Sequence, residues 1–253
     1  NVVQALLIKG SNVKLKDLHG KTALAHAILQ GHFSTAKTLI KHGADLNQNL
    51  LYASQRGYSE MVVFLLEENA EIDQFTAQNE TPLALASQGK HWETARILLE
   101  HGADPALKNS QGQTPLMLAV MTGEVNLVNI MLRHQTYGGQ ASELNTTDFI
   151  GNTPLMISAV HGYLELVKLL LELGAKVEKR NRWKESALIL AASKGFHEIA
   201  ELLIQYGADI RAEDVNKKTP LLRAAQNGHL FVVEMLISQG ANLHANAFDM
   251  SGE

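Results

Sequence analysis

Glycines recur along this chain with a period of about 33 residues, an interval typical of proteins that stack one supersecondary unit many times. Gly174, Gly207 and Gly240 are equally spaced, and the same interval separates Gly10 from Gly43. Each of these glycines follows a short apolar segment. Because a single unit of this length cannot bury its apolar face alone, each unit has to pack on its neighbours in an array.

The residues that punctuate each unit predict two short helices. Four of the five prolines follow a threonine, as in Thr114-Pro115. The threonine hydroxyl can cap a helix there, and proline at the first helical position loses no hydrogen bond. Glycine is favoured just beyond a helix end, where the backbone turns left-handed. We therefore expect first helices to end at Gly31, Gly57, Gly123, Gly162, Gly195 and Gly228, second helices at Gly10, Gly43, Gly102, Gly174, Gly207 and Gly240, and hairpin turns at Gly20, Gly112, Gly151 and Gly252.

These features resemble the ankyrin repeat, whose consensus is a turn, a Thr-Pro-Leu start, two short helices and a Gly-Ala-Asp close. The clearest copy reads Asn109-Ser110-Gln111-Gly112-Gln113-Thr114-Pro115-Leu116, and the resemblance covers essentially the whole chain. It implies an all-α ankyrin-repeat solenoid of stacked helix-turn-helix units with β-hairpin fingers and a concave binding face. The sequence departs from the family after Thr-Pro-Leu, where histidine is usual and this chain has Ala25, Leu51, Ala84, Met117, Met156, Ile189 and Leu222.

We expect a single ankyrin-repeat domain over residues 1–253. Residues 1–16 match the second half of a unit, and residues 249–253 resemble the start of a further repeat. Because repeat arrays need polar caps and neither end shows one, we expect a segment of a longer protein. Complete units begin near residues 17, 76, 109, 148, 181 and 214, and a short unit begins near residue 48.

Two irregularities interrupt the period. Gly43 and Gly57 are so close that the hairpin finger between them is missing, which leaves either a notch for a partner or a tolerated deletion. The interval from Gly102 to Gly174 exceeds two periods by six residues, and the extra residues lie within 136–143. Tyr137 in this insertion is either a binding or modification site or part of an exposed loop without a role.

Composition and motifs argue against several classes of function. The net charge of −4 disfavours binding to nucleic acid, and the chain has no apolar run long enough to insert into a membrane. There are no cysteines, and the histidines recur at repeat positions, as in His32, His91 and His229, which favours structural roles over a metal site. The segment from His197 resembles a zinc-protease helix but has Glu201 where a second histidine is needed. We therefore expect no catalytic, cofactor or metal site, and no enzyme activity.

A candidate binding surface comes from two neighbouring finger tips. Most tips are polar, but one presents Phe149-Ile150 and the next Arg182-Trp183. Exposed aromatic residues beside arginine are typical of binding hot spots. Alternatively, Phe149 or Trp183 folds onto the neighbouring hairpin and contributes only to stability. The ends of nearby first helices add Met121, Val160, His161 and Lys194 to the candidate site.

The charge around Trp183 suggests the chemistry of the partner. Lys176, Lys179, Arg180, Arg182 and Lys184 form a basic run, relieved by Glu178 and Glu185. This run either steers an acidic or phosphorylated partner or is a solvated loop.

The resemblance implies a protein–protein interaction module, a scaffold or adaptor that binds proteins or peptides on its concave face and finger tips. We expect a cytoplasmic monomer. The alternative is a targeting domain of a larger effector, enzyme or channel, including a bacterial effector that acts on host proteins in the host cytoplasm.

Overall fold

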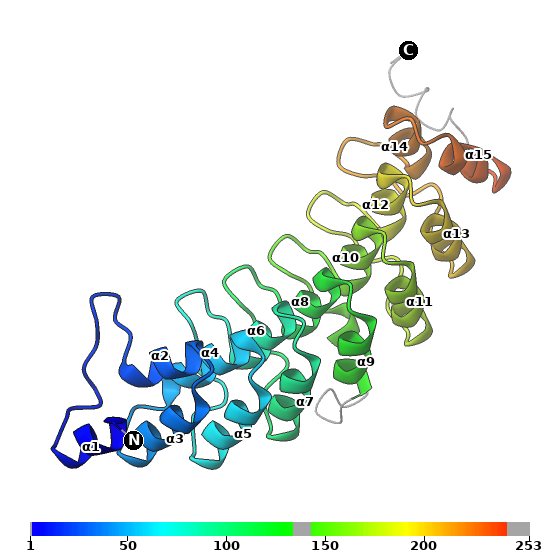
Figure 1. Ribbon diagram of the computed structural model, residues 1–253. Coiled ribbons are helices and arrows are strands. Elements are labelled where there is room, and N and C mark those ends of the chain that lie inside the picture. The colour runs from blue at the N-terminus through cyan, green and yellow to red at the C-terminus, as the bar shows by residue number, and fades with distance from the viewer. Residues whose placement is uncertain (1, 134–142, 242–253) are drawn as a thin grey trace. The chain divides into compact units, whose positions relative to one another are not determined.

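The computed structural model describes residues 2–133 and 143–241 and consists of helix pairs that follow one another along the chain (Figure 1). The first helices of the pairs are α2 (Ala23–Leu29), α4 (Asn47–Arg56), α6 (Pro82–Gln88), α8 (Pro115–Thr122), α10 (Pro154–His161), α12 (Ala187–Lys194) and α14 (Pro220–Gln226). The second helices are α1 (Val2–Ile8), α3 (Phe33–Lys41), α5 (Ser59–Glu67), α7 (Trp92–Glu100), α9 (Val125–Arg133), α11 (Leu164–Glu172), α13 (His197–Gln205) and α15 (Leu230–Ser238). A 3₁₀ turn, η2 (Glu143–Asn145), precedes α10.

The helix pairs form two compact bodies. Of the described residues, the N-terminal body comprises 2–110 and 114–133, and the C-terminal body comprises 111–113 and 143–241. In the N-terminal body α2, α4, α6 and α8 pack in succession, and α5, α7 and α9 form a second row. In the C-terminal body α10, α12 and α14 form one row and α11, α13 and α15 the other. The expected all-α architecture of stacked helix pairs is therefore confirmed, whereas a single domain over residues 1–253 stays a prediction.

Leucines at matching positions of the pairs make up much of the core. Most first helices place a leucine directly after their first residue, and this side chain is almost completely buried in Leu83, Leu116 and Leu188. In the second helices, Leu98 and Leu170 occupy matching positions and are also completely buried. Because burying one such side chain stabilises a fold by about 1.5–3 kcal/mol, neighbouring repeats depend on each other for their stability.

The predicted helix starts are confirmed. Threonine or serine caps six first helices through its side-chain oxygen, which accepts a hydrogen bond from the backbone N–H three residues later at 3.1–3.3 Å. These capping residues are Thr22, Thr81, Thr114, Thr153, Ser186 and Thr219. The helix of the short unit, α4, differs because its N-cap residue, Leu46, makes no side-chain bond.

The predicted helix ends are confirmed at the glycines that the structure describes, with one refinement. Gly162 after a first helix and Gly174 after a second helix have φ values of +78° and +89°, the left-handed region that glycine enters without strain. After α6, however, Gly89 keeps a negative φ and Lys90 takes the left-handed conformation, with φ of +62°. Lys90 stands nine residues after its capping residue Thr81, as Gly162 stands nine residues after Thr153, so a lysine fills the usual position of the turn glycine in this repeat.

Between most helix pairs the chain extends as a finger, a hairpin turn without regular strands. Among the described residues the structure shows a single isolated β-bridge, between Lys16 and Thr22. The connection from α3 to α4 is much shorter than the others and consists of residues 42–46, so the finger of the short unit is absent as expected. Tyr137 and most of the predicted insertion lie outside the described residues, as do residues 249–253.

No helix within residues 2–133 and 143–241 combines the length and the apolar character that crossing a lipid bilayer requires.

Candidate functional site

The fingers of the C-terminal body have the same internal construction. Each begins with aspartate or asparagine, whose side-chain oxygen accepts hydrogen bonds from the backbone N–H groups two and four residues later. Asp148, Asn181 and Asp214 fill this position and hold the turns 148–152, 181–185 and 214–218 closed. Short side chains of this kind favour such turns because they bond to their own backbone. The fold therefore fixes the backbone of each tip and leaves the following two side chains to project.

Neighbouring fingers are joined by one backbone hydrogen bond each. The N–H of Phe149 donates to the carbonyl of Gln111 at 3.0 Å, and the N–H of Arg182 donates to the carbonyl of Ile150 at 2.9 Å. The N–H of Val215 donates in the same way to the carbonyl of Trp183 at 2.9 Å. These bonds bring consecutive tips side by side. We call Phe149, Ile150, Arg182, Trp183 and Val215 the finger-tip strip.

The apolar side chains of the finger-tip strip are accessible. Phe149 is 56% exposed, Trp183 48%, Val215 48% and Ile150 38%. Phe149 also rests on the preceding finger, because a β-carbon added to Gly112 would come within 2.5 Å of the Phe149 ring. The Phe149 ring therefore packs on Gly112, while about half of the residue is exposed. Its role in binding stays a prediction.

The turn around Trp183 has the shape of its glycine-containing neighbours. Lys184 stands where the two preceding fingers have Gly112 and Gly151, and it adopts a φ of +56°. The next finger does the same with Lys217, whose φ is +55°. A non-glycine residue thus takes the left-handed position without changing the turn, and it places an additional cation beside Trp183.

Some of the basic residues around Trp183 form ion pairs, and others do not. Arg180 lies 4.0 Å from Glu178 and 3.9 Å from Asp209, and it also donates to the carbonyl of Glu213. Glu185 is engaged by Asn181 and Arg223. Arg182 and Lys184, like Lys176 and Lys179, are exposed and have no acidic partner within the described residues. The finger-tip strip consequently carries local positive charge on a chain of net charge −4.

The other predicted site residues lie in the last turns of first helices rather than on the fingers. Val160 and His161 are in the last turn of α10, about 10 Å along the helix from the finger at its start, given the rise of 1.5 Å per residue. Lys194 has the same place at the end of α12 and is exposed. Met121 is 39% exposed in the last turn of α8 and belongs to the N-terminal body. Val215, in contrast, belongs to the strip and was not predicted, although it occupies the repeat position of Phe149 and Arg182.

The imidazole ring of His161 contacts residues of its own repeat. Its Nδ1 lies 2.8 Å from the carbonyl oxygen of Ile157, and the ring stacks on Tyr163 with the centroids 5.6 Å apart. The same Nδ1-to-carbonyl contact occurs at His42 and His101.

Two other histidines link one repeat to the next. His91 and His229 each lie over a glycine of the preceding repeat, Gly57 and Gly195 respectively. Their Nε2 atoms are 3.1 Å from the carbonyl of Gln55 and 3.0 Å from that of Ser193. Within the described ranges no three histidine, aspartate or glutamate side chains come together as metal ligands would.

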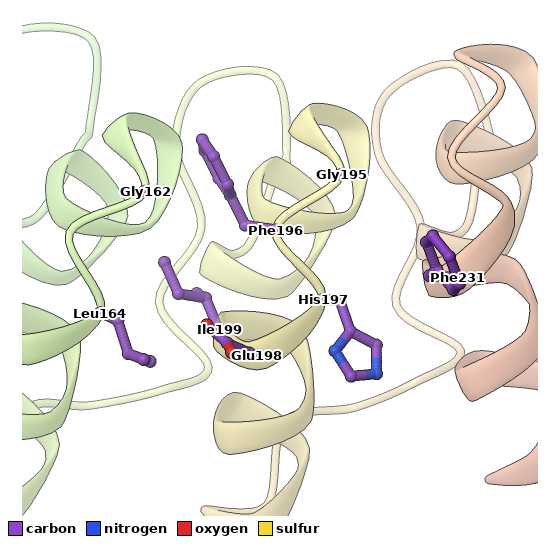
Figure 2. Close-up of a pocket in the computed structure, with 8 residues that line it drawn as sticks. All are labelled: Gly162, Leu164, Gly195, Phe196, His197, Glu198, Ile199 and Phe231. Atoms are coloured by element: carbon purple, nitrogen blue, oxygen red, sulfur yellow. The ribbon is translucent and has the colours of Figure 1, made fainter.

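A second surface of the C-terminal body, between helix turns, was not predicted from the sequence. A pocket of about 370 Å³ is lined by Gly162, Leu164, Gly195, Phe196, His197, Glu198, Ile199 and Phe231 (Figure 2). Figure 2 shows Phe196 between the ends of α10 and α12, and Phe231 on the opposite side of the pocket. The ring of Phe196 covers Gly162, in the manner of the linking histidines. Because Phe196 fills the position of His91 and His229, this pocket is a consequence of repeat packing.

Comparisons with known proteins agree with this architecture. A family model described as ankyrin repeats (three copies) matches residues 1–49, 49–109, 102–181 and 178–247. No protein of curated function matches the sequence. Among solved structures 549 chains match, so similarity of fold alone does not select a partner.

One matching structure is the crystal structure of the ankyrin repeat domain of Bcl-3, described as a unique member of the IkappaB protein family. The two chains are 25% identical with a TM-score of 0.72, and the match covers 86% of this chain and 99% of the Bcl-3 domain. Since the family model spans nearly the whole sequence, this chain belongs to the ankyrin-repeat family.

Proposed function

We propose that this chain is a protein-interaction module that binds an acidic or phosphorylated segment of a partner protein on the finger-tip strip of its C-terminal body. Ankyrin-repeat domains generally bind proteins. The observation that carries the proposal is the backbone bond from Arg182 to Ile150, which sets two exposed aromatic tips side by side. The cations Arg182 and Lys184, which have no acidic partner among the residues that the structure describes, stand beside them.

The chemistry of the strip favours binding over catalysis. Phe149 and Trp183 offer large areas that a partner can bury with little loss of side-chain freedom, which is typical of interface hot spots. Arg182 and Lys184 attract a carboxylate or phosphate group, and an arginine can hold such a group with two parallel hydrogen bonds. We propose a cytoplasmic monomer that acts as an adaptor.

The test is an affinity capture from cytosolic lysate with chemical crosslinking and identification of the bound proteins. The double variant Phe149→Ala, Trp183→Ala removes both anchors, and Phe231→Ala is the matched control because it truncates a ring that is 75% exposed on another surface. Loss of one anchor typically costs about 2 kcal/mol, which is about a thirtyfold rise in Kd. We expect the double variant to lose a specific protein that the control retains.

The charge component is tested separately with Arg182→Ala, Lys184→Ala. Because exposed charges act mainly on the association rate, we expect slower association and a weaker dependence of that rate on salt. Circular dichroism spectra must show that all variants fold. If the variants and the control capture the same proteins in the same amounts, the finger-tip strip is not the binding surface.

A further inference from the structure

The row of fingers in the N-terminal body is interrupted. A finger stands before α2 and another before α6, but only residues 42–46 connect α3 to α4 (Figure 1). We call the place of the absent finger the notch. It lies in the N-terminal body, whereas the finger-tip strip lies in the C-terminal body.

The notch leaves two backbone groups without the partners that the pattern of the fingers supplies elsewhere. In this body the N–H of Ser110 donates to the carbonyl of Gln78 at 2.9 Å, as in the three finger-to-finger bonds of the C-terminal body. Ala77 occupies the position of Ser110 in the finger that follows the notch. Its N–H donates no hydrogen bond within the described part of the chain, and Ala77 is exposed. On the other side, the carbonyl of His19 accepts none from any residue that the structure describes.

The surroundings of the turn glycines also show that no finger stands beside the turn at Gly20. A β-carbon added to Gly112 or Gly151 would meet backbone atoms of the following finger, at 2.7 Å from the Phe149 nitrogen and 3.0 Å from the Asn181 α-carbon respectively. A β-carbon added to Gly20, the turn glycine before the notch, would meet nothing within 4 Å. The place beside this turn is therefore open where other repeats have a finger.

A pocket of about 340 Å³ occupies the notch. It is lined on one side by Gln48, Leu51, Tyr52 and Gln55 of α4, and on the other by Gln74, Phe75, Thr76, Ala77, Gln78 and Glu80 of the following finger, with Leu85 of α6. The lining combines apolar surface, including Phe75 at 51% exposure, with four glutamine side chains. Glu80 is the only charged residue of this lining. A volume of this size lies at the lower end of the range of ligand pockets.

We propose that the notch binds an extended segment of a partner protein whose backbone takes the place of the absent finger and whose lysine or arginine side chain faces Glu80. A backbone carbonyl of the segment accepts the hydrogen bond of the Ala77 N–H, as the Gln78 carbonyl does for Ser110. Adding an extended peptide to an open backbone edge is an established way of recognising peptides, in which main-chain bonds give affinity and pockets give specificity. Because the lining holds one carboxylate and no cation, charge complementarity selects a basic residue.

A single substitution tests whether the notch binds a peptide or whether the missing finger is a deletion without a role in binding. Ala77 is the second residue of a turn in which the N–H of Asn79 donates to the carbonyl of Thr76 at 3.0 Å. Proline is favoured at the second position of such turns, so Ala77→Pro removes the N–H and keeps the turn. The matched control is Leu18→Pro, since Leu18 has the same position in the turn closed by Gly20 and Asp17 and does not line the pocket.

The probe is a displayed library of random linear peptides, selected on the whole chain with Phe149→Ala, Trp183→Ala present to exclude binders of the finger-tip strip. We expect basic peptides whose Kd rises about threefold to tenfold in Ala77→Pro, the value of one hydrogen bond. We expect a comparable rise in Glu80→Gln and no change in Leu18→Pro. Amide exchange should show that the bound peptide protects the Ala77 N–H.

Three results would overturn the proposal. The first is a library that yields no peptide specific for the chain. The second is a set of peptides that bind Ala77→Pro and Leu18→Pro equally well. The third is a set without lysine or arginine whose binding is unaffected by Glu80→Gln. None of these results bears on the finger-tip strip, because its anchors are absent from the chain used in the selection.

Discussion

Replacing Gly162 by alanine introduces two strains that the structure allows to be measured separately. Gly162 has a φ of +78°, and alanine in this left-handed region is destabilised by about 1–2 kcal/mol. In addition, the new β-carbon would lie 2.6 Å from the ring of Phe196 in the next repeat. Overpacking of this kind costs about 1–3 kcal/mol. We therefore expect Gly162→Ala to lower the free energy of unfolding by about 3 kcal/mol.

Gly174 provides the matched control in the same repeat. Its φ is +89°, but an added β-carbon would meet no atom within 4 Å. Gly174→Ala should therefore carry only the backbone strain of about 1–2 kcal/mol. Both substitutions reduce the freedom of the unfolded chain equally, so this contribution cancels in the comparison.

The measurement is urea denaturation followed by circular dichroism for the two single variants, Phe196→Ala, and the double variant Gly162→Ala, Phe196→Ala. If the ring of Phe196 causes the additional loss, the two substitutions are coupled by about 2 kcal/mol, since removing the ring removes the clash. Equal losses for Gly162→Ala and Gly174→Ala, or strictly additive effects in the double variant, would refute the reasoning.

Two further predictions concern contacts between repeats. The side chain of Asp214 is fully buried, and although burial raises the pKa of this carboxyl, hydrogen bonds from Lys218, Arg223 and Asn216 lower it below its usual value. Because a lowered pKa stabilises the fold above the pKa of the unfolded state, thermal melts should show stability falling as the pH drops below about 4; Asp214→Asn should flatten this dependence and lose about 2 kcal/mol at pH 7. His229→Phe keeps a ring over Gly195 but loses the contact with the Ser193 carbonyl, which Asn227 also bonds at 2.7 Å, so denaturation should show a loss of only about 0.5–1 kcal/mol.

The sequence predicted those features of the fold that depend on local chemistry. A left-handed turn after a helix and a threonine cap are requirements of a few adjacent residues, so the glycine and threonine positions located most helix boundaries. The repeat of α6 shows the limit of this reasoning, because Lys90 rather than a glycine takes the left-handed position there. The packing of the His91 ring against Gly89 and Gly57 is also not visible in the local sequence.

Features that depend on contacts between repeats were predicted less well. The sequence showed that Glu178 and Glu185 interrupt the basic run around Trp183, but it did not show that Arg180 also pairs with Asp209 of the following repeat. The contact of Phe149 with Gly112 similarly joins two fingers and depends on the side-chain rotamer. Val215 was missed because an isolated exposed valine is not conspicuous until the backbone bond to Trp183 places it beside the other tips.

One backbone pattern underlies both proposed surfaces. Where consecutive fingers are present, the N–H of the second finger residue donates to the preceding finger, and side chains such as Phe149 and Trp183 are what a partner contacts. Where a finger is absent, the N–H of Ala77 itself is open, and the backbone contributes to recognition. Binding at the two surfaces should therefore be sensitive to different substitutions. Truncated side chains should abolish binding at the finger-tip strip, whereas removal of a single N–H should weaken binding at the notch and leave the strip unaffected.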